Sequence, residues 1–267
     1  MATANGWPIW YELMTRDPRI IAPFYKEVIG WTIPAEGMTM PNGANYRQIE
    51  RADGGHEGGV LAFDQGMIDA GMQPMWATYF CVDDVDATIA KATGLGARIH
   101  MSATTVPGAG RMAMLSDPQG AMFYLIAPQP PEGMEDYESG VFSVDRVGCA
   151  RWNELSTPDD IGAVAFYGAL FGWNTDSSMD MGPMGQYRFI ELAGEQIGAI
   201  SPVLADGVPP NWLPYFRVAD IRAARAAILA HGGSVVMDVH EVPGDEEIVI
   251  ATDPDGAAVG FVAAKAG

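Results

Sequence analysis

The stretch that decides the fold is Trp10–Trp31, WYELMTRDPRIIAPFYKEVIGW, because it recurs at 152–173 as WNELSTPDDIGAVAFYGALFGW. Identical residues in these two stretches lie 142 positions apart. The match then continues at slightly shorter offsets, as insertions in loops produce: Tyr46-Arg47 pairs with Tyr187-Arg188, 141 apart, and the motif Asp117-Pro-Gln-Gly-Ala121 pairs with Asp253-Pro-Asp-Gly-Ala257, 136 apart. The chain is therefore a duplicated sequence.

A repeat of this length predicts two copies of a whole domain. Solenoid repeats run roughly 20 to 50 residues and need several copies to bury a core. The 267 residues fit two domains of ordinary size, about 100 to 150 residues each, so that each could bury a core of its own. We expect domains at 1–128 and 148–267, joined by a linker at 129–147, where prolines and acids replace the apolar pattern between Pro128 and Gly140.

Composition excludes several classes of partner. The 34 acidic residues exceed the 15 basic ones, and the formal charge of −19 repels nucleic acid and anionic membrane surfaces. We find no N-terminal targeting pattern and no apolar run of the roughly 18 residues that a membrane span needs, so we expect a cytoplasmic protein. Cys81 and Cys149 are too few for a disulfide framework.

Each copy carries the same predicted order of elements twice. Residues 10–14 alternate as a half-buried strand does, and Asp17 is placed to cap a helix that Gly30 ends. Residues 76–82 form a second predicted strand, and Asp83 or Asp84 caps the helix that follows. Further strands complete each half of each copy.

These motifs in this order resemble the vicinal oxygen chelate superfamily of glyoxalases, extradiol dioxygenases and bleomycin-resistance proteins. The resemblance rests on the Phe-Tyr-x-x-x-x-Gly-Trp helix, the Tyr-Phe-x-Val-x-Asp strand and the Asp-Pro-x-Gly-Ala hairpin. It implies an α+β fold of tandem vicinal oxygen chelate domains, each of two paired β-α-β-β-β modules whose curved mixed sheets form a cup. The modules would span about 7–64, 74–128, 148–204 and 211–264.

The resemblance also implies where a metal ion would bind. Metal-using members of the superfamily take one ligand, His, Gln or Glu, from each of four strands. Those positions fall in turn on Trp10 and Trp152, Glu50 and Glu191, Ala77 and Leu213, and Tyr124 and Gly260. Only the glutamates could coordinate, whereas a divalent ion needs about three protein ligands. We therefore expect no metal site and no cofactor, with an atypical divalent metal site as the alternative.

Four glutamates are the candidate catalytic residues: Glu12, Glu50, Glu154 and Glu191. Glu12 and Glu154 lie two residues beyond the lost first ligand and so share its strand face. Two interpretations are open. The glutamates could pair across a cup as general acid and base, or bind a cation; otherwise each hydrogen-bonds backbone or a tyrosine hydroxyl.

Strand alternation also places candidate ligand-binding residues inside the cups: Trp10, Tyr46, Tyr79 and Tyr124 in the first copy, and Trp152, Tyr187, Tyr215 and Arg217 in the second. The aromatic rings would form a cage for a planar or cationic ligand, or simply fill the cup. Arg217 matches Cys81 of the first copy. It would bind an anionic ligand, or form a salt bridge to Glu191 or Glu154.

Two functions follow. The first is a binding protein that holds a small organic molecule in one or both cups, as bleomycin-resistance relatives do, without the family metal. The alternative is an enzyme, a glyoxalase-like lyase or isomerase or a dioxygenase, that uses the glutamates. Because the duplication could complete the sheets within one chain, both a monomer and a homodimer remain open.

Overall fold

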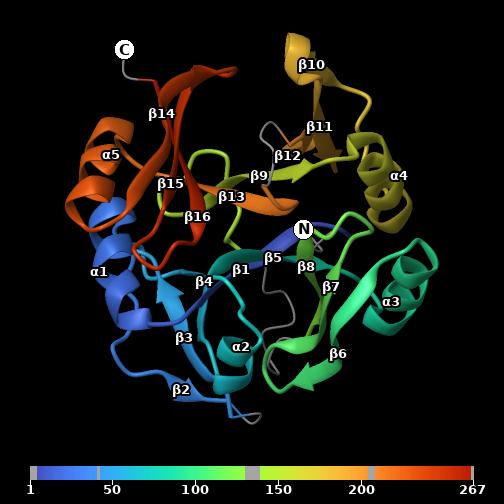
Figure 1. The fold of residues 1–267 in the computed structure, drawn as a ribbon, viewed down its shortest axis with the longest axis horizontal. Helices are drawn as coiled ribbons and strands as arrows, with labels where there is room; N and C mark the ends of the chain where they lie inside the picture. The colour runs from blue at the N-terminus through green and yellow to red at the C-terminus, as the bar shows by residue number, and fades with distance from the viewer. Residues whose placement is uncertain (1–4, 41–42, 130–138, 204–207, 266–267) are drawn as a thin grey trace. The chain divides into compact units, whose positions relative to one another are not determined.

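A computed structural model describes residues 5–40, 43–129, 139–203 and 208–265. Four strand–helix–three-strand modules follow one another along the chain, as the colours of Figure 1 show. None of the helices in these residues is long and apolar enough to cross a membrane. In chain order the elements are β1 (Pro8–Thr15), α1 (Pro18–Ile29), β2 (Met38–Thr39), β3 (Asn45–Glu50), β4 (His56–Ala62), α2 (Gln65–Asp69), β5 (Met75–Cys81), α3 (Val85–Gly94), β6 (Arg98–Val106), β7 (Gly110–Ser116), β8 (Met122–Pro128), β9 (Ala150–Thr157), α4 (Asp160–Phe171), β10 (Ser178–Asp180), a 3₁₀ turn (Gly182–Met184), β11 (Gln186–Leu192), β12 (Glu195–Pro202), β13 (Asn211–Arg217), α5 (Ile221–Ala230), β14 (Ser234–Val242), β15 (Glu246–Thr252) and β16 (Ala258–Ala264).

The strand order confirms the predicted α+β fold of tandem, paired β-α-β-β-β modules. It is β2-β3-β4-β1-β5-β8-β7-β6 in the first copy and β10-β11-β12-β9-β13-β16-β15-β14 in the second. Both sheets are mixed, because the first strand of each module pairs in parallel with the last, while the last three strands of each module pair antiparallel with one another.

The predicted helix boundaries are confirmed by their caps. Asp17 accepts a hydrogen bond from the Arg19 backbone N–H, and Gly30 ends α1 in the left-handed region with φ +86°. Asp159 and Gly172 do the same for α4. Of the two candidates for α3, Asp84 is the cap.

The compact units of the structure cut across the repeat. One unit holds residues 1–9, 78–139 and 152–212, and the other holds 10–77, 140–151 and 213–267. We call them unit 1 and unit 2. Each therefore combines one module of the first copy with one of the second, whereas the domain boundaries 1–128 and 148–267 remain a prediction from sequence.

The core of unit 2 shows what joins its two modules. We expected each copy to bury a core of its own, but Tyr11 and Phe24 of the first copy share one buried cluster with Phe216 and Phe261 of the second. The helices α1 and α5 lie side by side (Figure 1). The apolar side chains of α1 are therefore buried against residues of the second copy.

The repeated tryptophan, tyrosine and Asp-Pro motifs form one buried network in each unit. In unit 2, Trp76 Nε1 donates to Tyr25 Oη at 2.9 Å, and Tyr25 Oη donates to Asp253 Oδ2 at 3.1 Å. In unit 1 the same atoms of the corresponding residues are joined at 3.0 and 3.1 Å: Trp212, Tyr167 and Asp117. We therefore assign these motifs a structural role and look for the functional site among other residues.

The predicted linker is only partly within the described residues. Its acids Glu132, Glu135, Asp136 and Glu138 fall outside them. Beyond that gap the chain is packed, since Val141 is buried in the unit 2 core and Trp31 Nε1 donates to the Gly148 carbonyl at 2.9 Å.

Candidate functional site

The most complete polar cluster among the predicted site residues lies on β9 and β11 in unit 1. Trp152 Nε1 donates to Tyr187 Oη at 2.8 Å, and Tyr187 Oη donates to Glu154 Oε2 at 2.7 Å. Phe189 sets its ring edge-on to both aromatic side chains, at centroid distances of 6.1 and 5.6 Å. The interpretation that Glu154 bonds a tyrosine hydroxyl is confirmed.

The same positions of the first copy form a matching cluster on β1 and β3 in unit 2. Trp10 Nε1 donates to Tyr46 Oη at 2.8 Å. Burial and the nearby charge of Glu12 raise the pKa of Tyr46, although the Trp10 bond lowers it. Burial and Glu154 likewise raise the pKa of Tyr187 well above its usual range. Both phenols therefore stay protonated at neutral pH, and each can donate a hydrogen bond.

The structure separates the four predicted glutamates by exposure. Glu12 is 4% exposed, Glu154 and Glu191 are half-buried, and Glu50 is exposed. The strand pairing shifts register just before Glu50 and Glu191, and such a bulge re-aims side chains. Within the described residues, no three His, Cys, Asp or Glu side chains are grouped so that they could hold a metal ion.

The remaining aromatic candidates differ between the copies. In unit 1, Tyr79 and Tyr124 stand opposite each other on β5 and β8 and stack with centroids 4.0 Å apart and planes 5° apart. In unit 2, Tyr215 stands opposite Gly260, and a Cβ atom on Gly260 would collide with the Tyr215 ring. The Tyr124 ring of the first copy therefore has no counterpart in the second copy, where Gly260 takes its position.

The structure gives Arg217 a partner that the sequence did not suggest, while the salt bridge to Glu191 or Glu154 stays a prediction. Arg217 Nη2 bonds a carboxylate oxygen of Glu246 on β15, and Arg151 Nη2 lies 3.5 Å from the other oxygen. The register explains the choice, because Arg217 stands opposite Val262 on β16, and Val262 stands opposite Ile248, two residues from Glu246. Sequence comparison offered no signal, since Glu246 matches Gly110 of the first copy.

Sequence reasoning also missed a buried ion pair. Arg51 Nη1 donates to Glu57 Oε2 at 3.0 Å, and Glu57 Oε1 accepts from the Ala150 backbone N–H at 2.8 Å. The Glu57 side chain is 0% exposed and that of Arg51 is 5% exposed. Glu57 is the extra residue of the β3–β4 bulge, so simple alternation could not place it. Glu57 of the pair ties the start of β9 to the β3–β4 hairpin.

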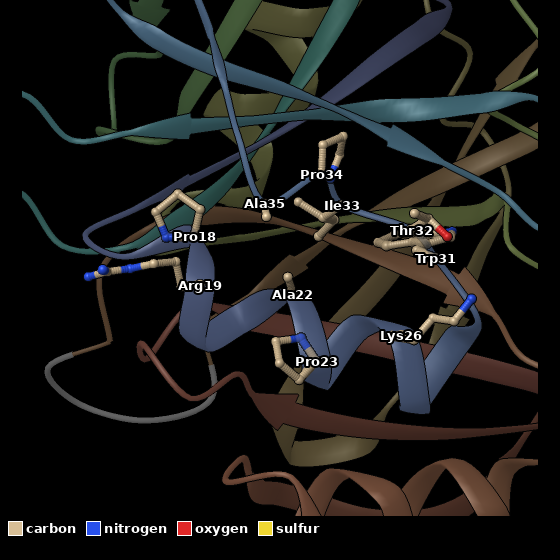
Figure 2. A pocket seen from close by; sticks show the side chains of 10 residues that line it. All are labelled: Pro18, Arg19, Ala22, Pro23, Lys26, Trp31, Thr32, Ile33, Pro34 and Ala35. Carbon is tan, nitrogen blue, oxygen red and sulfur yellow. The ribbon is translucent and has the colours of Figure 1, made fainter.

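A hollow of about 490 Å³ lies elsewhere on unit 2, between α1 and residues 31–35. Figure 2 shows Arg19 and Lys26 near opposite ends of the helix, and Ala22 of the helix pointing toward Ile33 of the facing segment. Its lining residues include no carboxylate, imidazole or thiol, and none of the predicted site residues. It is therefore a poor candidate for a catalytic site.

Comparison with known proteins agrees with this architecture. The model of the Glyoxalase/Bleomycin resistance protein/Dioxygenase superfamily matches residues 8–125 and 151–261. The chain belongs to this superfamily. The two matched segments correspond to the two copies of the repeat.

Similar proteins cover almost the whole chain. The "Putative glyoxylase CFP32" of Mycobacterium tuberculosis is 31% identical over 253 residues, which cover 95% of this chain and 93% of that protein. The "Anthracycline biosynthesis protein DnrV" of Streptomyces peucetius is 30% identical over 278 residues, covering 99% and 95%. The Mn(II)-bound glyoxalase from Novosphingobium aromaticivorans is similar in structure, with a TM-score of 0.63 at 15% identity over 98% of this chain and 83% of that one; this likeness concerns the fold alone.

Proposed function

We propose that this protein binds a small aromatic or amphipathic organic molecule in one or both cups, without the divalent metal of the superfamily's metal-using members. The observation that carries the proposal is the Trp-to-Tyr hydrogen bond of 2.8 Å that occurs in both copies. Trp10 and Trp152 take the position of the first metal ligand, and each indole N–H is engaged by a phenol. The position thus holds an aromatic ring and has no lone pair for a metal ion.

The other metal positions fit an ion no better. Tyr124 is stacked on Tyr79, and Gly260 has no side chain. The side chains of Ala77 and Leu213 have no atom that could coordinate a metal ion. One carboxylate for each copy falls short of the roughly three protein ligands that a divalent ion needs. The protein would then act without a bound divalent ion.

The chemistry of the strand faces supports an aromatic ligand. Trp152, Tyr187 and Phe189 present three rings on neighbouring strands, and such rings bind planar molecules by stacking and edge contacts. Glu154 adds a polar group that is held in one orientation by Tyr187. The name of the 30%-identical Streptomyces peucetius protein connects it with anthracyclines, which are planar polycyclic aromatic compounds.

The bond between Tyr187 and Glu154 also favours a second candidate, an enzyme of glyoxalase or dioxygenase type. A carboxylate fixed at 2.7 Å from a phenol is oriented as a general base requires. In that case Glu154→Gln would abolish turnover and leave ligand affinity within about twofold. Under the binding proposal, no turnover exists to be lost, and the substitution changes affinity alone.

The deciding experiment is native mass spectrometry of freshly purified, untagged protein, followed by denaturation to release and identify anything bound. We expect no stoichiometric divalent ion, and we expect an organic ligand or a protein that takes up planar aromatic compounds on titration. A matched pair of variants, Tyr187→Phe and Tyr46→Phe, then tells which copy binds. A stoichiometric divalent ion that is lost in Glu12, Glu50, Glu154 or Glu191 variants would overturn the proposal.

A further inference from the structure

Three charged residues of unit 2 distinguish the second copy from the first. Arg217, Glu246 and Arg151 meet at the starts of β15 and β9 and at the end of β13. The corresponding residues of the first copy are Cys81, Gly110 and Ile9, none of which carries charge at neutral pH. The charged cluster is therefore a property of the second copy alone.

The side chains of the cluster are largely shielded from water. The side chains of Arg217, Arg151 and Glu246 are 9%, 19% and 14% exposed. Glu246 is the carboxylate that contacts both guanidinium groups, and the Arg217 Nε–H has no hydrogen-bond partner among the residues that the structure describes. Buried charges are normally paired and hydrogen-bonded, so Arg217 retains capacity to bind another oxygen anion.

The neighbouring groups indicate what kind of anion would fit. Tyr215 precedes Arg217 by two residues and so lies on the same face of β13. Its ring covers Gly260, where the first copy has the stacked Tyr124. An aromatic face next to a guanidinium suits a planar carboxylate, because the fork of N–H donors matches the two carboxylate oxygens.

We propose that Arg217 binds the carboxylate of an aromatic carboxylic acid, and that Glu246 takes the place of this carboxylate when no ligand is bound. The inference rests on the proposed binding function and narrows its ligand class for the second copy. It makes Glu246 a competitor of the ligand. Removing Arg217 and removing Glu246 must then change affinity in opposite directions.

The experiment uses 4-fluorobenzoate and its neutral counterpart 4-fluorobenzamide as probes, with dissociation constants taken from ¹⁹F NMR line widths on the full chain. We expect the acid to bind at least about tenfold more tightly than the amide, as one charge-assisted hydrogen bond predicts. Arg217→Met should remove this preference, and Glu246→Gln should strengthen acid binding. Thermal unfolding of each variant checks that it is folded.

Arg222→Met is the matched control. Arg222 pairs with Glu247 in the same unit, and its side chain is 63% exposed, so the variant loses the same charge without touching the cluster. It should leave the preference for the acid unchanged.

The outcomes separate this inference from the proposed function. If acid and amide bind equally, or if the preference survives Arg217→Met, the inference is overturned while an aromatic ligand remains supported. If Glu246→Gln weakens acid binding, Glu246 is a partner of the arginines and the competition is disproved. If neither probe binds at millimolar concentration, the inference fails, whereas the mass spectrum of the purified protein still decides the proposed function.

Discussion

Tyr25 and Tyr187 make the same two hydrogen bonds, so comparing them predicts how much unfolding free energy is lost when a phenol oxygen is removed at a buried and at a half-buried site. Tyr25 accepts from Trp76 at 2.9 Å and donates to Asp253 at 3.1 Å. Tyr187 accepts from Trp152 at 2.8 Å and donates to Glu154 at 2.7 Å. The two differ in burial, since Tyr25 and Trp76 are 0% and 2% exposed, whereas Tyr187 and Trp152 are half-buried.

Tyr25→Phe should lower the free energy of unfolding by about 3 to 5 kcal/mol. The variant leaves the buried Trp76 N–H without its partner, which costs about 1 to 3 kcal/mol, and deletes a bond to a carboxylate, which contributes about 1.5 to 3 kcal/mol. The ring itself keeps its stacking on Trp31, at a centroid distance of 5.5 Å. Tyr187→Phe should cost only about 1 to 2 kcal/mol, because water can replace the phenol at a half-exposed site.

Urea unfolding followed by circular dichroism and tryptophan fluorescence measures both losses. The midpoint should fall while the slope with urea concentration stays constant. Tyr167→Phe repeats the test in unit 1, where Trp212 and Asp117 are the partners. Equal losses for Tyr25→Phe and Tyr187→Phe, or a loss below about 1 kcal/mol for Tyr25→Phe, would refute the reasoning that burial sets the cost.

Three further predictions concern titration, charge burial and packing. Burial raises the pKa of Asp253 from 3.8 to about 6, so the native state binds the proton more tightly than the unfolded chain. Stability from this group is therefore lost as pH rises from about 4 to 6. Relative to Asp253→Asn, the natural protein should be more stable at pH 4 than at pH 7 by on the order of 2 to 3 kcal/mol, and an NMR titration midpoint below 3.8 would contradict this. Arg51→Met should cost about 3 to 5 kcal/mol by chemical denaturation, because Glu57 stays buried without its cation; the double variant Arg51→Met/Glu57→Leu should recover part of the loss, and strictly additive losses would disprove the coupling. Gly260→Ala should cost about 1 to 3 kcal/mol, because the added Cβ collides with the Tyr215 ring, and an unchanged unfolding midpoint would show that the ring moves freely.

The candidate site could be predicted only in part. Strand alternation correctly grouped Trp152, Glu154 and Tyr187, because a period of two residues needs only a regular strand. It could not anticipate the bulge that turns Glu57 into the interior. Nor could it find Glu246, which reaches Arg217 from a strand two places away in the sheet and has no counterpart in the first copy.

The sequence by itself determined the duplication, the four modules and the helix caps. These features depend on residues close together along the chain, such as Asp17 and Gly30 at the two ends of α1. The tertiary structure alone decided which modules share a core. Tyr25 of the first copy meets Asp253 of the second, and Tyr167 of the second meets Asp117 of the first. Both copies carry the same motifs, so a tyrosine of either copy could bond an aspartate of either one. The choice is made by the packing of whole helices and sheets, and local sequence patterns do not encode it.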